Sequence, residues 1–188
     1  MRYSLAFFNL DGISPVMHEQ AKAAARRGDP DGIFGCEDSN KSLYLLSKNL
    51  RWFARNGLYE KALLAAWVNQ KFVPPGFAES MKKALLSANR ERLMKHSDPL
   101  PEGDEFTVYR GVRKGVARGI SWTLDPNVAR LFAGQFGFAG TVYRTVVQRS
   151  DVYAYVSDVT GRCGEKEVLL VLPEDYPIEV FEKVEASS

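Results

Sequence analysis

The stretch that decides the fold reads Cys163-Gly164-Glu165-Lys166-Glu167-Val168-Leu169-Leu170-Val171-Leu172. Two carboxylates two residues apart lead directly into an unbroken apolar run, which is typical of a buried strand. Alternate side chains of a strand point to the same face, so we expect Glu165 and Glu167 to lie together, about 7 Å apart, with Lys166 on the other face. Two like charges on one face repel each other unless a cation or a substrate compensates them. This stretch is therefore the first candidate for a functional site.

The rest of the chain has the composition of a globular protein, with 188 residues, of which 45% are hydrophobic and 26% charged. One domain, residues 1–188, accommodates this length. Apolar residues recur at helical spacing in much of residues 1–100, whereas residues 101–188 are rich in Val, Tyr, Phe and Thr. This order predicts an α+β fold with a mainly helical part followed by a β-rich core.

Local patterns predict the individual elements. Helices are expected over residues 16–27 with Ser14 as N-cap, from Ser39 to the Asn56-Gly57 stop, from Tyr59 onward, and over 77–95. Strands are expected over residues 105–109, 119–122, 141–148, 152–156, 167–172 and 178–184. The segment from Gly28 to Gly32 has the composition of a loop.

One short helix interrupts the strands. Asp125 is a good N-cap and Pro126 suits the first helical position. Val128, Leu131 and Phe132 would form the apolar side of this helix.

Charge and cysteine content exclude some classes of protein. Residues 1–100 hold 15 basic and 10 acidic residues, but a surplus of five over a hundred residues is typical of solvated surface, so the sequence does not indicate a nucleic-acid partner. Two cysteines without a CxxC motif and two histidines predict no metal site. The apolar run Leu5-Ala6-Phe7-Phe8 is too short for a signal peptide or a membrane span. We therefore expect a soluble protein with no membrane partner.

Two further segments carry residues suited to chemistry. In Val108-Tyr109-Arg110-Gly111, the guanidinium of Arg110 offers the forked donors that suit a phosphate, and Gly111 would let a ligand approach the backbone. A surface salt bridge is the ordinary alternative for Arg110. Ser121 and Thr123 straddle Trp122, so on a strand both hydroxyls share one face while the indole packs on the other.

Taken in chain order, these residues resemble the arginine-type mono-ADP-ribosyltransferases, a family with many bacterial toxins and phage-encoded host modifiers. The family pattern is an Arg at the end of the first core strand, a Ser-Thr-Ser motif on the second, and Glu-x-Glu or Gln-x-Glu opening the fifth. Here the matching residues are Arg110, Ser121-Trp122-Thr123 and Glu165-Lys166-Glu167. The Ser motif departs from the pattern at its second and third positions but keeps the first hydroxyl. The resemblance covers residues 105–184 and implies N-terminal helices packed on a two-sheet mixed β core.

The resemblance implies that the protein transfers ADP-ribose from NAD to an arginine side chain of a protein and releases nicotinamide. It implies no metal. Glu167 would act on the ribose through its 2′-hydroxyl, and Ser121 would hold Glu167 in place. Glu165 would face the acceptor, orienting and helping to deprotonate a guanidinium. Arg110 would bind the pyrophosphate. The implied catalytic residues are Glu167, Glu165, Ser121 and Arg110, and the implied NAD-binding residues are Arg110, Gly111, Ser121, Thr123, Phe136 and Glu167. Phe138 is an alternative to Phe136 for stacking on nicotinamide, and core packing is the ordinary interpretation of either ring.

Other functions fit the same residues. The site could hydrolyse NAD with water as acceptor or modify a nucleic acid, or the chain could be a non-catalytic binding module of the same fold. The presence of Arg110, Ser121 and Glu167 argues against a dead site. The expected partners are NAD and a host or target protein with an acceptor arginine, in the cytoplasm of the producing or the target cell.

Overall fold

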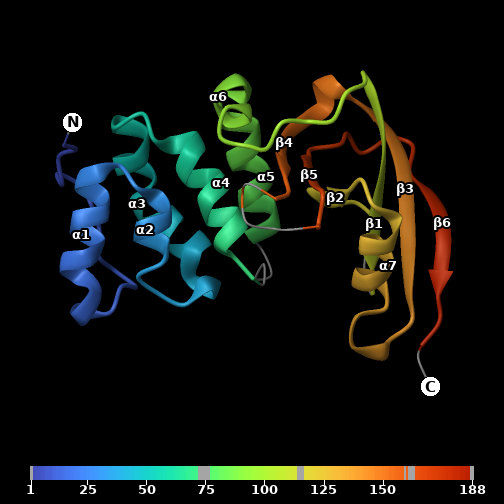
Figure 1. Ribbon diagram of the computed structural model, residues 1–188, viewed down its shortest axis with the longest axis horizontal. Coiled ribbons are helices and arrows are strands. Elements are labelled where there is room, and N and C mark those ends of the chain that lie inside the picture. Colours follow the sequence, from blue (N-terminus) through green and yellow to red (C-terminus); the bar gives the residue numbers. More distant parts are fainter. Residues whose placement is uncertain (1, 72–76, 114–116, 159, 161–163, 187–188) are drawn as a thin grey trace. The chain divides into compact units, whose positions relative to one another are not determined.

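The computed structural model describes residues 2–71, 77–113, 117–158, 160 and 164–186. The chain divides into two compact units, Met1–His96 and Ser97–Ser188. The first unit is helical and the second is built on a sheet, as Figure 1 shows. The α+β order predicted from the sequence is therefore confirmed, and the change of structure lies close to the change of composition.

The helical unit contains six α-helices among its described residues. These are α1 (His18–Arg27), α2 (Pro30–Phe34), α3 (Ser42–Arg55), α4 (Tyr59–Asn69), α5 (Phe77–Ser87) and α6 (Arg90–Met94), with short 3-10 helices at Pro15–Met17 and Ser39–Lys41. Its core holds Trp52 and Phe53 of α3, both fully buried. Among the described residues, no helix is long and apolar enough to cross a bilayer.

Three expectations for this unit are wrong in detail. The predicted loop from Gly28 to Gly32 contains the start of α2, because the Asp29 side chain accepts a hydrogen bond from the backbone N–H of Gly32 and caps the helix. Ser14 makes no side-chain cap, and a 3-10 turn precedes α1. The single helix expected over residues 77–95 is two helices, because Asn89 caps α6 and its own N–H donates to the Glu60 carboxylate of α4 at 2.9 Å.

The second unit contains one antiparallel sheet. Its six strands lie in the order β4 (Val152–Val156), β5 (Glu167–Leu170), β2 (Ser121–Thr123), β1 (Glu105–Val112), β3 (Gly140–Gln148) and β6 (Glu179–Val184). The positions of all six strands match the sequence prediction within about three residues. The predicted two-sheet mixed core is wrong, because the short strand β2 pairs with β5 on one side and with β1 on the other, and every neighbouring pair is antiparallel.

Hydrophobic side chains cover both faces of this sheet. The larger cluster gathers buried residues of five strands: Phe106, Val108, Trp122, Val147, Val152, Tyr155, Val168 and Leu170. On the other face, helix α7 (Pro126–Ala133) packs against β1 and β3 through Ala129, Ala133 and Val142. Figure 1 shows α7 lying against these strands.

Helix α7 begins as predicted but buries a different side. The Asp125 carboxylate accepts a hydrogen bond from the backbone N–H of Asn127, which confirms Asp125 as the N-cap. Leu131 and Phe132, expected on the apolar side, are 73% and 47% exposed. The buried residues are small because α7 lies so close to the sheet that only Ala fits between them.

Candidate active site

The centre of the site is a hydrogen bond between β2 and β5. Ser121 Oγ donates to Glu167 Oε1 at 2.6 Å. In the register of these strands Thr123 faces Glu167 and Ser121 faces Leu169, so Ser121 and Glu167 are diagonal neighbours, which long side chains can bridge. The contact expected between the two residues is thus confirmed, while its role in catalysis stays a prediction.

Glu167 is buried at the first position of β5. Only 4% of the residue is exposed, and its second carboxylate oxygen, Oε2, is buried too. A carboxylate removed from water needs a hydrogen bond or a nearby cation, because desolvation otherwise favours its neutral form. The Ser121 hydroxyl supplies the hydrogen bond.

Arg110 of β1 provides the positive charge of the site. Its Nη1 donates to the backbone carbonyl of Ser121 at 2.7 Å, and the charges of Arg110 and Glu167 attract each other. Burial lowers the pKa of Arg110, and the negative charge of Glu167 acts in the opposite direction. The ordinary interpretation, a surface salt bridge, is therefore not what holds this side chain. A guanidinium keeps its charge at neutral pH even when its pKa is lowered.

Gly119 makes room for this guanidinium. A Cβ at Gly119 would lie 2.4 Å from Arg110 Cζ and 2.5 Å from Nη2. Among the described residues, the buried Nε of Arg110 has no hydrogen-bond partner. The sequence prediction included Arg110 but missed Gly119, because nothing in the local pattern places these two residues together.

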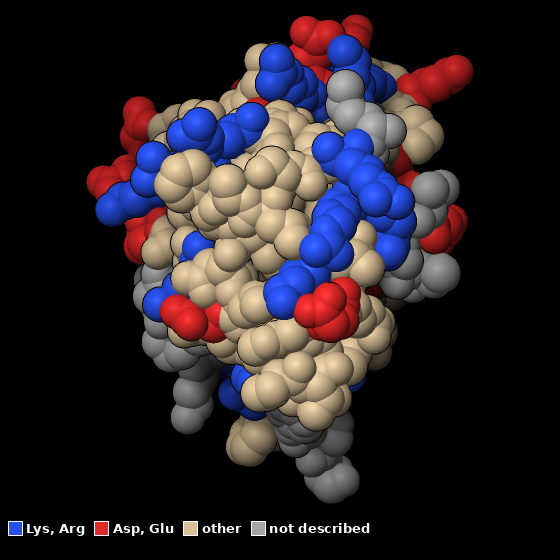
Figure 2. Space-filling view, turned by 90° about the vertical axis from the view of Figure 1, so that its left-hand side faces the viewer, with Lys and Arg blue, Asp and Glu red and all other residues tan. Residues whose placement is uncertain are grey.

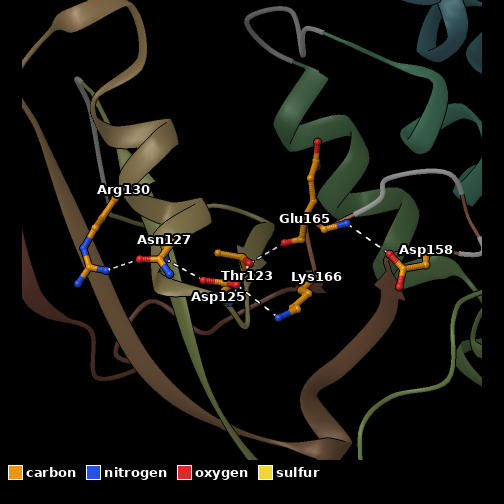
Figure 3. Close-up of polar contacts among 8 residues, drawn as sticks. Thr123, Asp125, Asn127, Arg130, Asp158, Glu165 and Lys166 are labelled. Atoms are coloured by element: carbon orange, nitrogen blue, oxygen red, sulfur yellow. Dashed lines mark hydrogen bonds and ion pairs between the residues drawn. The ribbon is translucent and has the colours of Figure 1, made fainter.

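Thr123 ties the end of β2 to the turn before β5. Its Oγ1 donates to the backbone carbonyl of Glu165 at 2.6 Å and accepts from the N–H of Asp125 at 3.0 Å (Figure 3). The resemblance implied that Thr123 binds NAD. The observed contacts instead engage its hydroxyl in holding the backbone at Glu165, and a role toward NAD stays a prediction.

The turn itself differs from the geometry expected for Glu165. Strand β5 begins at Glu167, and Lys166 has a φ of 46°, in the left-handed region that a side chain disfavours. The alternation of a strand does not pass through such a residue, so the expectation that Glu165 and Glu167 share a strand face is wrong. Figure 3 shows the Glu165 and Lys166 side chains extending to opposite sides. Glu165 is half-buried.

A polar chain leads from this turn into α7. Lys166 Nζ pairs with Asp125 Oδ2 at 3.4 Å, and Arg130 Nη1 donates to the Asn127 side-chain carbonyl at 2.8 Å (Figure 3). The hydrogen bond from the Asn127 N–H is the main cause that lowers the pKa of Asp125, and Lys166 lowers it further. The cap of α7 and the Glu165 turn therefore support each other. Sequence reasoning found the cap but not its link to the turn.

The turn after β4 has its own anchor, Asp98. Its Oδ2 accepts from the backbone N–H of Ser157 at 2.6 Å and from the hydroxyl of Thr160 at 2.7 Å. Asp98 is only 4% exposed, so these bonds hold the start of the turn from inside the unit. Nothing in the sequence distinguished Asp98 from an ordinary loop residue.

The remaining predicted residues are less informative. Gly111 pairs with Val142 of β3, and a Cβ at Gly111 would lie 1.9 Å from the carbonyl oxygen of Ala129, so close packing of α7 accounts for this glycine. The side chain of Phe136 lies outside the described residues. Phe138 is 55% exposed, and the Arg113 guanidinium lies 5.4 Å from its ring centroid. The ordinary interpretation of Phe138 as a core residue is therefore wrong, and its stacking on nicotinamide stays a prediction.

Within the described residues, no three His, Cys, Asp or Glu side chains gather as metal ligands would. Cys36 is buried with a free thiol, and Cys163 lies outside the described part of the chain.

Comparison with known proteins adds no relative. No protein-family model matches the chain, and neither a curated protein nor a solved structure is significantly similar to it.

Proposed function

We propose that this protein is a mono-ADP-ribosyltransferase that transfers ADP-ribose from NAD to an arginine side chain of a protein. The observation that carries the proposal is the arrangement of Ser121 and Glu167. A buried carboxylate, oriented by a hydroxyl 2.6 Å away and near one guanidinium, combines an oriented negative charge with a phosphate-binding group. NAD needs both.

The reaction makes use of a fixed negative charge. The bond between ribose C1′ and the nicotinamide nitrogen breaks, its electron pair leaves with nicotinamide, and positive charge develops on the ribose. A carboxylate aimed at that sugar stabilises the transition state more than the ground state, which is what lowers a barrier. We assign this task to Glu167, acting through the ribose 2′-hydroxyl.

Ser121 and Arg110 prepare the site for this step. Because Ser121 fixes Glu167 Oε1, little reorganisation is needed as charge develops. Arg110 is half-buried, and the forked donors of a guanidinium suit the pyrophosphate of NAD. The guanidinium would then neutralise phosphate charge.

Transfer is completed by an acceptor nitrogen. The guanidinium nitrogen of the target arginine bonds to C1′ and loses a proton, for which Glu165 is the proposed acceptor. A guanidinium is always charged in water, so a carboxylate that orients it and accepts its proton assists the attack.

The test is to incubate the protein with NAD labelled in its adenylate part and a cell lysate. Label is expected on protein with the wild type and should be absent with Glu167→Gln, which keeps the shape of the side chain and removes its charge. Losing such a charge costs several kcal/mol in the barrier, and each 1.4 kcal/mol is about tenfold in rate. Glu174→Gln, a change at an exposed position, is the matched control and should be as active as the wild type.

Three outcomes contradict the proposal. Activity of Glu167→Gln within a few-fold of the wild type would move the catalytic carboxylate elsewhere. Label that appears only as free ADP-ribose would favour NAD hydrolysis, and label on nucleic acid would favour a nucleic-acid acceptor.

A further inference from the structure

The helical unit carries a basic surface that the proposed active site does not use. Helix α3 presents Tyr44, Lys48, Arg51 and Arg55 along one exposed stripe, and Phe7 of the N-terminal segment packs beside the last two. These five residues are called the α3 basic face. The stripe follows from helical geometry, since residues three and four apart lie one above another.

The charges on this face are not compensated. Helix α3 contains no Asp or Glu, and none of the ion pairs found in the described part of the chain involves Lys48, Arg51 or Arg55. Four other basic side chains of the unit are paired with carboxylates: Lys22 with Glu19, Arg27 with Asp29, Lys41 with Glu37 and Lys95 with Glu91. Figure 2 draws the side that lies at the left of Figure 1 and shows Lys and Arg side chains, with some Asp and Glu side chains beside them, around an uncharged area.

Aromatic rings lie among these cations. The guanidinium carbons of Arg51 and Arg55 lie 4.3 and 4.9 Å from the ring centroid of Phe7, and Lys48 Nζ lies 5.2 Å from that of Tyr44. Phe7 is 53% exposed and Tyr44 39%. Each ring therefore keeps part of its surface in contact with solvent.

The backbone holds Phe7 in this exposed position. Its φ is 69°, an uncommon conformation for a bulky residue. The segment is anchored on both sides, by a hydrogen bond from Trp52 Nε1 to the Ser4 carbonyl at 2.7 Å and by one from the Asn9 N–H to the Asn49 side chain at 2.8 Å. A bulky apolar side chain kept on the surface by a strained turn points to a function.

From these observations we infer that the α3 basic face is a binding surface for single-stranded nucleic acid. Uncompensated cations in a row attract successive phosphates, and exposed rings offer stacking surfaces for bases. From Lys48 to Arg55 the row extends about 10 Å along the helix, at about 1.5 Å per residue. Leu50 is 40% exposed, but the other large apolar side chains of α3, such as Trp52 and Phe53, are buried in the unit, so this helix has no continuous apolar face to insert into a membrane.

This inference does not rest on the proposed transfer reaction. The number of charged residues gave no reason to expect a nucleic-acid site, because five more basic than acidic residues over residues 1–100 is a modest surplus. The positive charge becomes concentrated in one place only because α3 aligns Lys48, Arg51 and Arg55 on one face. The experiment needs no NAD, so failure of one proposal is distinguishable from failure of the other.

The test measures binding of the full chain to a fluorescein-labelled 15-nucleotide single strand of mixed sequence by anisotropy, at several salt concentrations. The triple variant Lys48→Gln, Arg51→Gln, Arg55→Gln should bind at least about tenfold more weakly. Its slope of log K against log salt should be shallower by about 2, at about 0.7 per phosphate contact on a single strand. Lys83→Gln, which removes an exposed charge on α5, is the control and should reduce neither the affinity nor the slope by a comparable amount.

A second variant separates stacking from charge. Phe7→Gly removes the ring at a position whose φ glycine adopts freely, so the unit should remain folded. Affinity should fall about tenfold while the salt slope stays unchanged. The inference would be overturned if neither the triple variant nor Phe7→Gly weakened binding to the oligonucleotide. Tighter binding of the protein to phosphatidylserine vesicles than to the oligonucleotide would also overturn it. Equal binding of duplex and single strand, with no effect of Phe7→Gly, would also overturn it.

Discussion

Ser121 and Glu167 lie diagonally across two antiparallel strands, and the Ser121 hydroxyl donates to the Glu167 carboxylate at 2.6 Å. The carbonyl of the same serine accepts a hydrogen bond from Arg110 at 2.7 Å. One residue therefore connects the carboxylate and the guanidinium of the candidate site, and it does so where β2 joins the two sides of the sheet. Substitutions of Ser121 and of the residues near it should therefore distinguish effects on catalysis from effects on the stability of the fold.

Ser121→Ala should lower kcat for nicotinamide release by about 10- to 100-fold and change KM for NAD little. The reason is that a hydrogen bond to a charged group contributes about 1.5–3 kcal/mol, and here it orients the carboxylate that we propose acts in the transition state. Steady-state kinetics on the purified variant checks this. Ser121→Thr keeps a hydroxyl and should recover part of the rate, whereas a purely structural role would show as equal loss of stability in both variants.

Glu165→Ala should separate transfer from hydrolysis. Glu165 precedes β5 and is proposed to serve the acceptor, so its loss should reduce transfer to a protein or to agmatine far more than it reduces nicotinamide release. Both signals can be measured in one reaction. Equal loss of both would instead assign Glu165 to the ribose step or to the fold.

Gly119→Ala should weaken NAD binding without unfolding the protein. The new Cβ would lie 2.4 Å from Arg110 Cζ, so the guanidinium must move, and a flexible side chain can do so at little cost in stability. We expect KM for NAD to rise about tenfold, the equivalent of one charge-assisted hydrogen bond. In an Arg110→Met background the same change should have almost no further effect on KM, and additive effects in this double-mutant cycle would disprove the coupling.

Gly111→Ala should destabilise the sheet unit by about 3 kcal/mol or more, because overpacking against a backbone cannot be relieved by a rotamer change. The added Cβ would lie 1.9 Å from the Ala129 carbonyl oxygen and 2.7 Å from the Ala133 nitrogen. Urea unfolding followed by circular dichroism measures the effect. Gly57→Ala is the comparison: among the described residues beyond its two chain neighbours, no atom lies within 4 Å of that Cβ, so its cost should be confined to the left-handed φ, about 1 kcal/mol.

The sequence alone determined the elements whose causes are local. Alternating β-branched and aromatic residues placed the six strands, and Asp125 with Pro126 placed the start of α7. It also singled out Arg110, Ser121 and Glu167, because each is a residue type suited to the task proposed for it and lies at or next to the start or end of a predicted strand.

Only the tertiary structure decided the features that depend on distant partners. The break between α5 and α6 involves Glu60 on another helix, and the buried side of α7 is set by its close approach to Gly111, which favours Ala129 over the larger Leu131. The single sheet arises because β2 finds partners on both sides. The direction of the Glu165 side chain depends on Lys166, which adopts a left-handed conformation beside the Asp125 carboxylate. The two-residue spacing of Glu165 and Glu167 in the sequence does not reveal this conformation. Periodicity reports which face a residue prefers, whereas the depth of packing and the choice of partner come from contacts between segments far apart in the chain.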